Sequence, residues 1–308
     1  MLQFTHKKIF SYGKFSNFRY IIFLDGDDTI AQASLQHLHD KIVEQPGADI
    51  YAGAIEEYLH NTGEVFLFLD NFAMKKSPYE CSGQEATLLL YNAWEYPCPM
   101  VQANIWSRVF LMEHRLRFVP GLQYEDSEFS PRAIYLARRV IPLHEPFYRY
   151  RIRDNSITTT ASNKLETFLG HLAIRFKSLF RFHATECALP GFDARISRCL
   201  AGNWLRLLRN CWFHPINTAK INEQRRRDTL NVLFADGFDD FKKIAKADTA
   251  CHRMLAHLVR LWVCPPSVAR LVDFFFHYFG FPLAEFRSKA LRNSLPSPWV
   301  PQKPRQQK

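Results

Sequence analysis

Hydrophobic positions follow two different spacings in the first half of the chain. Short apolar runs, typical of buried strands, occur at residues 20–24, 48–53, 64–69 and 140–143. Apolar residues recur at helical spacing in residues 34–43, 83–94 and 127–139, and residues 105–114 are amphipathic. Strands that alternate with helices predict an α/β layer architecture.

The pattern changes after residue 162, where strand signals almost disappear. An apolar stripe at helical spacing begins there: Leu165, Phe168, Leu169, Leu172, Phe176 and Leu179. Further helices are predicted at residues 201–212, 224–234, 251–263 and 267–279. We therefore expect an α/β domain over residues 1–160, a helical region over residues 161–292, and a disordered Pro-rich tail over residues 293–308.

Charge divides the chain at nearly the same place. Residues 1–160 carry 16 Lys and Arg against 19 Asp and Glu, whereas residues 161–308 carry 24 against 11. The first part is thus near −3 and the second near +13, which indicates two functional regions. Basic helices with Phe and Trp suit peripheral contact with an anionic membrane better than nucleic-acid binding, because no recognised nucleic-acid module accompanies them.

The seven cysteines and the N-terminal sequence indicate in which cellular compartment the protein is found. The cysteines are scattered, without a Cys-x-x-Cys pair, and no apolar signal core follows the basic start of the chain. No apolar stretch reaches the ~20 residues that a transmembrane helix needs. We expect a cytoplasmic protein, peripheral at the inner face of the membrane if it binds lipid.

The strand at residues 20–24 ends in a cluster of carboxylates, Asp25, Asp27 and Asp28. Ligands of open α/β sheets bind beyond the carboxyl ends of the strands, and hard divalent cations prefer carboxylate oxygens. An Asp/Gly turn without function would look the same. The segment also resembles two enzyme motifs: the opening Asp-x-Asp-x-Thr motif of haloacid dehalogenase-type phosphatases and the Asp-x-Asp motif of nucleotide-sugar glycosyltransferases.

A second acidic pair, Glu125 and Asp126, precedes the helix predicted at residues 127–139. Helix N-termini present exposed N–H groups and a positive dipole end, which orient a carboxylate and keep it ionised. Such a group can act as a general base. An acidic helix cap is the structural alternative.

Together with the run at residues 145–158 (Glu-Pro-Phe-Tyr-Arg-Tyr-Arg-Ile-Arg-Asp-Asn-Ser-Ile-Thr), the pair resembles the end of a family 2 glycosyltransferase domain. The Asp-x-Asp strand end, the Glu-Asp pair and this run occur in the family's order. The likeness covers residues 18–160. It implies an incomplete GT-A (Rossmann-like) domain, followed by the helical region. A phosphatase would also need a late acidic pair after a strand, and Asp239-Asp240 lies in a helical context instead.

The resemblance also assigns roles to individual residues. Asp27 would bind Mg²⁺ or Mn²⁺, Asp25 would face the nucleotide, and Asp28 would be a further ligand or support the site. Asp126, with Glu125 as second choice, would deprotonate an acceptor hydroxyl in an inverting transfer. The donor would be a nucleotide-diphosphate sugar, the acceptor a glycan or lipid-linked glycan, and the setting the synthesis of a surface polysaccharide.

Two positively charged side chains complete the predicted site. Arg151 and Arg153 would contact phosphate or acceptor, although exposed arginines on a strand are more often solvated or paired.

The chain departs from the family at its start. Only 19 residues precede the strand at 20–24, too few for the βαβ unit of about 30 residues that would bind the nucleoside. We therefore expect a truncated domain in which one edge of this strand lies open. A non-catalytic remnant or interaction protein is the alternative function.

Overall fold

The computed structural model describes residues 2–5, 18–31, 33–69, 80–90, 100–122, 124–153 and 165–196, together with Lys243. The helices predicted at 201–212, 224–234, 251–263 and 267–279, the Asp239-Asp240 pair and the tail at 293–308 lie outside these residues. The described residues form a mixed α/β fold, as the hydrophobic pattern predicted.

Seven strands in the described part of the chain build one sheet, in the order β1-β2-β6-β4-β7-β3, with β5 paired to β4. Their bounds are β1 Leu2–Thr5, β2 Tyr20–Phe23, β3 Thr29–Ile30, β4 Ile50–Leu59, β5 Val65–Leu69, β6 Asn104–Ser107 and β7 Val140–Ile152. The β1–β2 and β4–β7 pairs are parallel, and the other pairs are antiparallel.

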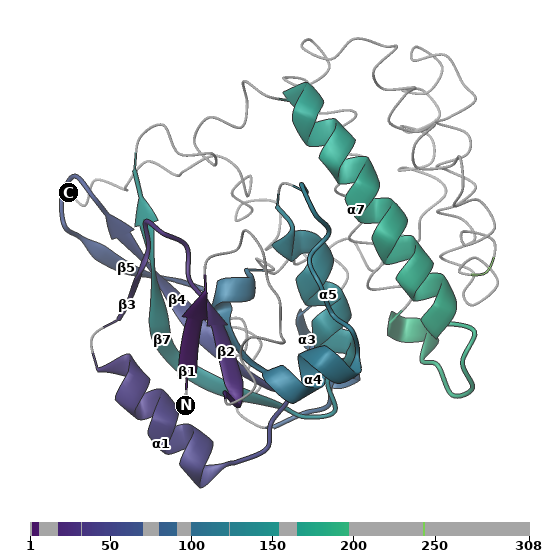
Figure 1. Cartoon of the computed structure of the whole chain (residues 1–308), viewed down its shortest axis with the longest axis horizontal. Helices are drawn as coiled ribbons and strands as arrows, with labels where there is room; N and C mark the ends of the chain where they lie inside the picture. The colour runs from purple at the N-terminus through teal and green to yellow at the C-terminus, as the bar shows by residue number, and fades with distance from the viewer. Residues whose placement is uncertain are drawn as a thin grey trace, which may run out of the picture.

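The helices gather beside this sheet (Figure 1). Their bounds are α1 Ser34–Glu44, α3 Gly83–Leu90, α4 Arg108–Glu113, α5 Asp126–Leu136 and α7 Leu165–Glu186, with a short 3₁₀ turn, η2, at Val101–Ala103. Helix α1 contacts β7, α3 packs on α5, and α7 runs beside α5 on the side away from the sheet (Figure 1).

The sequence predictions need three corrections. Residues 105–114 are not one amphipathic element: Asn104–Ser107 is strand β6, placed between β2 and β4, and the helix begins at Arg108. The extended segment at 140–143 is the start of a longer strand, β7. The edge of β2 is not open, because β1 pairs with it in parallel from Leu2↔Tyr20 to Thr5↔Phe23.

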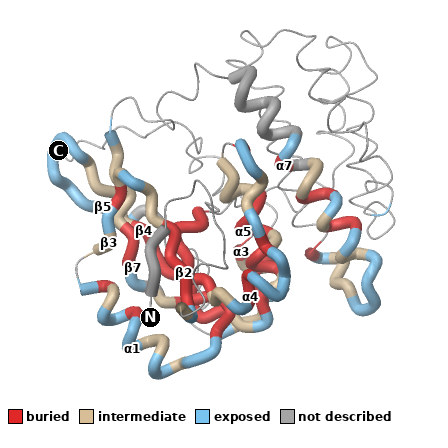
Figure 2. Tube along the Cα trace, viewed as in Figure 1, coloured by how far each residue is buried: buried red, intermediate tan, exposed pale blue. Residues whose placement is uncertain are grey.

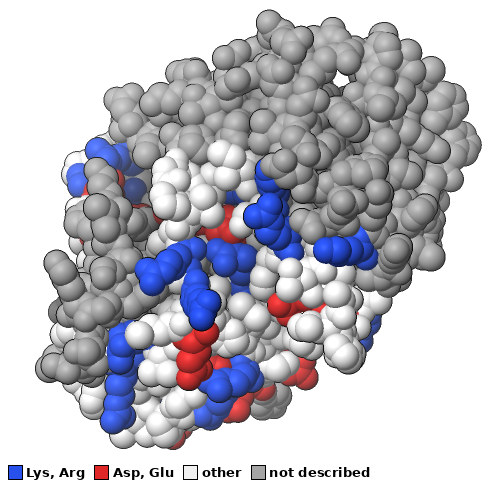
Figure 3. Space-filling model, turned by 45° about the vertical axis from the view of Figure 1, so that its right-hand side comes forward, with Lys and Arg blue, Asp and Glu red and all other residues white. Residues whose placement is uncertain are grey.

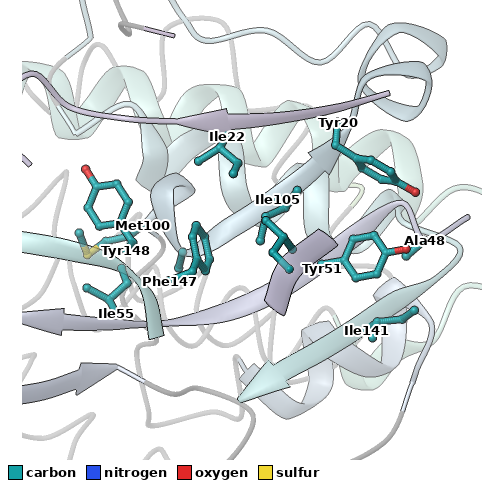
Figure 4. Packing of buried hydrophobic residues seen from close by; sticks show 12 residues of the cluster. Tyr20, Ile22, Ala48, Tyr51, Ile55, Met100, Ile105, Ile141, Phe147 and Tyr148 are labelled. Carbon is teal, nitrogen blue, oxygen red and sulfur yellow. The ribbon is translucent and has the colours of Figure 1, made fainter. Parts of the chain in front are cut away.

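The core lies where β2, β4, β6 and β7 meet (Figures 2 and 4). All four residues of β2 are buried, as are the first six of β4. Strands covered on both faces read as continuous apolar runs, which explains why the sequence signals these strands clearly. Gly53 belongs to this core because an added Cβ would collide with the ring of Phe147.

Helix α7 begins at Leu165, the first residue of the predicted apolar stripe. Of the stripe predicted for it, Leu179 is buried and the other five side chains lie outside the described set.

No helix in the described ranges is long and apolar enough to cross a membrane. On the face shown in Figure 3, Lys and Arg side chains of the described residues are interspersed with Asp and Glu.

Candidate functional site

The carboxylate cluster forms a turn directly after β2. The N–H of Asp28 donates to the carbonyl of Asp25 over 3.2 Å, which closes the turn. Strand β3 then starts at Thr29 and pairs with β7 at Arg149. The turn is therefore fixed between β2 and the far end of β7.

Asp28 is the buried member of the cluster, with 8% of its surface exposed. Its Oδ2 accepts a 2.5 Å hydrogen bond from the Tyr148 hydroxyl, and its Oδ1 accepts a 2.8 Å bond from the Arg151 N–H. Burial raises the pKa of Asp28 to about 6, although the two hydrogen bonds act in the opposite direction. Burial is the main cause that raises the pKa of the Tyr148 hydroxyl, and the negative charge of Asp28 raises it further.

Asp25 is held from two sides. Its Oδ2 accepts a 2.7 Å bond from Nε2 of Gln102, a buried residue of η2. Its N–H donates to the Tyr148 hydroxyl over 3.2 Å. Tyr148 thus bridges the first and last residues of the turn.

Asp27 is the accessible member of the cluster, since 40% of its side chain is exposed. Its Oδ2 pairs with Arg153, 3.0 Å from Nε and 2.9 Å from an Nη nitrogen. Two residues that the sequence predicted for one site, Asp27 and Arg153, are therefore in direct contact. The pair lies near the surface, where a competing anion or cation can reach it.

The three carboxylates do not converge on one point. Each has its own partner, and among the residues that the structure describes no group of three or more His, Cys, Asp or Glu side chains could hold a metal ion. Mg²⁺ sites commonly use only one or two carboxylates, with substrate phosphates and water as the other ligands. Asp27 fits that kind of site by its exposure, whereas both oxygens of Asp28 already accept hydrogen bonds.

Glu125 and Asp126 lie at the N-terminus of α5, as predicted. Asp126 is the first residue of the helix, and its Oδ1 accepts a 2.8 Å bond from the N–H of Ser127. The carbonyl of Glu125 accepts from the N–H of Phe129 over 2.9 Å. The helix end thereby fixes the direction of the Asp126 carboxylate, whereas the Glu125 side chain makes no capping hydrogen bond.

An aromatic cluster joins the two acidic segments. Phe23, two residues before Asp25, lies with its ring centroid 6.2 Å from that of Phe129, three residues after Asp126. Phe118 contacts both rings, at 5.1 and 4.5 Å, and Trp106 packs on Phe129 at 5.4 Å. Three of these pairs are edge-to-face and the Phe118–Phe129 pair is tilted, and ring contacts at these separations are favourable, so they hold the end of β2 against α5.

Sequence reasoning missed three residues that shape this region. Gln102 carries no motif, and nothing in the pattern pointed to it. Tyr148 stood inside the recognised run, but its position on a strand did not show that its hydroxyl reaches the Asp turn. Arg175 lies on α7, outside residues 18–160, which resemble a family 2 glycosyltransferase domain.

Arg151, which the sequence predicted for the site, contacts the turn through its backbone N–H. Its side chain instead lies 2.9 Å from His60.

Comparison with known proteins gives sequence relatives and a fold. No family model matches the chain. It is 27% identical over 155 residues to glycosyltransferase GlyA of Streptococcus pneumoniae serotype 4, across 47% of this chain and 20% of GlyA. It is 21% identical over 193 residues to glycosyltransferase GlyG of the same organism, across 61% of this chain and 60% of GlyG. The chain is similar to glycosyltransferases.

The structural comparison extends further along the chain. The crystal structure of S. aureus TarS 1–349 superposes with a TM-score of 0.52 and 18% identity, over 86% of this chain and 68% of TarS 1–349. At that identity the likeness shows the fold alone. The chain spans a fifth of GlyA and three fifths of GlyG, so these relatives support glycosyl transfer only in general terms.

Proposed function

We propose that this chain is a glycosyltransferase of the GT-A type, family 2, which moves a sugar from a nucleotide-diphosphate donor to a hydroxyl of a glycan or lipid-linked glycan. One observation carries the proposal: three segments far apart in the sequence meet at the end of β2. They are the Asp turn at 25–28, the acidic pair at 125–126 and the end of β7. Tyr148 and Arg153 tie the turn to β7, and the Phe23–Phe129 contact ties it to α5.

The donor would lie over the Asp turn. The exposed Asp27–Arg153 pair places a carboxylate beside a guanidinium. A diphosphate would bind Arg153, and Asp27 would then bind the divalent cation. A divalent cation, Mg²⁺ or Mn²⁺, would neutralise charge on the leaving diphosphate. Asp25, anchored by Gln102, would face the nucleotide.

Asp126 would act as the general base. It would accept the proton of the acceptor hydroxyl while that oxygen attacks the anomeric carbon, and the bond from this carbon to the diphosphate would break on the opposite face. The configuration would therefore invert. Glu125, its neighbour, is the second candidate for this role.

Turnover of the donor tests the proposal. The full chain is incubated with Mn²⁺ and, in turn, UDP-glucose, UDP-galactose, UDP-N-acetylglucosamine and GDP-mannose, and released nucleoside diphosphate is measured. We expect release from at least one donor, and a loss of about 10²–10⁴-fold in kcat in Asp126→Asn. Asp40→Asn, at an exposed position of α1, is the matched control.

The proposal fails if no donor is turned over, or if Asp126→Asn and Glu125→Gln both keep full activity. The first result would favour a non-catalytic interaction protein on the same fold.

A further inference from the structure

Helix α7 reaches the loop that carries the proposed base. Arg175, on α7, is 3% exposed, and its guanidinium carbon lies 5.7 Å from the ring centroid of Tyr124. A buried guanidinium over an aromatic face is attracted to the ring and holds it in place. Tyr124 immediately precedes Glu125 and Asp126, so Arg175 contacts the residue that begins the acidic segment.

Tyr124 itself has a constrained backbone. Its φ of 55° lies in the left-handed region, which a side chain as large as Tyr seldom adopts. Its carbonyl accepts the N–H of Ser127 over 3.0 Å, a bond that opens α5. Such a conformation persists only where neighbouring structure enforces it, and the packing of Arg175 on the ring supplies that constraint.

A second contact from α7 lies just beyond the acidic pair. Ser178, one helical turn after Arg175, donates a 2.6 Å hydrogen bond to Oε1 of Glu128. Glu128 is fully buried, and its Oε2 accepts a 2.8 Å bond from Arg132. Arg175 and Ser178, on successive turns of α7, thus contact the residues on either side of Glu125 and Asp126.

From these contacts we infer that Arg175 is a positioning residue for Glu125 and Asp126: through the Tyr124 ring it holds the start of α5 in the geometry that proton transfer needs. The inference rests on the proposed function. It extends the proposed active site beyond the α/β domain, because α7 belongs to the helical region. Arg175 acts through Tyr124 and is not itself a catalytic residue.

Hydrogen–deuterium exchange tests the positioning without any substrate. We expect the amides of Ser127, Glu128 and Phe129 to exchange about tenfold faster in Arg175→Met than in the unchanged protein, with Arg175→Lys in between. Arg181→Met, at an exposed position of the same helix, should leave these amides unchanged. If Arg175→Met does not fold, Tyr124→Leu removes the same contact and should show the same faster exchange. Equal exchange in the unchanged protein and in the folded variant would overturn the inference.

Kinetics separate positioning from general support of the fold. With a donor that the unchanged protein turns over, Arg175→Met should lower kcat about 10- to 100-fold and leave the KM for the donor within about twofold, since a misplaced base affects the reaction more than donor binding. Arg175→Lys should recover part of kcat.

The outcomes distinguish the inference from the proposed function. Unchanged kcat in Arg175→Met, or an equal change in KM, contradicts the positioning role alone. An unchanged protein that turns over no donor contradicts the proposed function, and with it the role assigned to Arg175.

Discussion

The hydroxyl of Tyr148 donates a 2.5 Å hydrogen bond to Oδ2 of Asp28, across 120 residues of sequence. The same hydroxyl accepts the N–H of Asp25, so one buried side chain of β7 holds both ends of the acidic turn. The turn is thereby held at both of its ends, while the side chain of Asp27 between them is 40% exposed.

Removal of the Tyr148 hydroxyl should therefore destabilise the fold. In Tyr148→Phe the buried Asp28 loses one donor, and we expect the free energy of unfolding to fall by about 2–3 kcal/mol. Urea unfolding measures the change, and Tyr58→Phe on β4 is the matched control, with an expected effect of less than about 0.5 kcal/mol.

A double-mutant cycle isolates the pair. If Tyr148 acts through Asp28, the loss in Tyr148→Phe should shrink when Asp28→Asn is already present, with a coupling of about 1–3 kcal/mol. Additive losses would show that the two side chains do not interact as described.

Apolar runs in the sequence predicted four of the seven strands in the described part of the chain, β2, β4, β5 and β7, and missed β1, β3 and β6. Residues 20–24 and 48–53 are covered on both faces, so their apolar runs match β2 and the start of β4 closely. Strand β6 was missed because Asn104–Ser107 is only four residues long and runs directly into α4, so its pattern merges with that of the helix.

The candidate site was only partly predictable. The acidic segments stood out because carboxylates at a strand end and at a helix start are locally encoded. Contacts such as Gln102 with Asp25 and Arg175 with Tyr124 depend on how distant elements pack, and no local pattern encodes them. The metal-ligand roles of Asp25, Asp27 and Asp28 stay predictions.

His183 should make the stability depend on pH. It is 1% exposed on α7, and burial lowers its pKa to about 3, below the usual 6.5. Between pH 3 and pH 6.5 the unfolded chain binds a proton at His183 that the folded chain does not. The stability gained from keeping His183 neutral is therefore complete above pH 6.5 and is lost as the pH falls toward 3. The total is roughly 3–5 kcal/mol.

Unfolding measured from pH 7 to pH 5 checks this dependence. The stability of the unchanged protein relative to His183→Gln should begin to decline near pH 6.5. The raised pKa of Asp28 acts in the opposite direction below pH 6, but equally in both proteins, so the difference between them isolates His183. His39→Gln, at an exposed position, should keep the original slope. The same slope in His183→Gln as in the unchanged protein would contradict the assignment.

Gly83 should tolerate no side chain. It starts α3 where an added Cβ would meet the carbonyl oxygens of Ile134, Tyr135 and Ala137 at the end of α5. Backbone atoms cannot move aside as a flexible side chain can, so Gly83→Ala should cost about 1–3 kcal/mol or more. Gln84→Ala, exposed in the same helical turn, is the control for thermal unfolding and should change stability by less than about 0.5 kcal/mol.

Thermal unfolding of the full chain with a nucleoside diphosphate and Mn²⁺, compared with Asp27→Asn, measures whether the Asp turn binds the diphosphate part of a sugar donor. A ligand at 100 times its Kd stabilises the folded state by about 2.7 kcal/mol, so we expect a clear rise in Tm with UDP or GDP plus Mn²⁺. Asp27→Asn should fold normally, because its ion pair is exposed, but should lose the rise, whereas Asp40→Asn should retain it. No rise with either nucleotide would show that the chain does not bind these donors' diphosphates, and an equal rise in Asp27→Asn would show that Asp27 does not hold the cation.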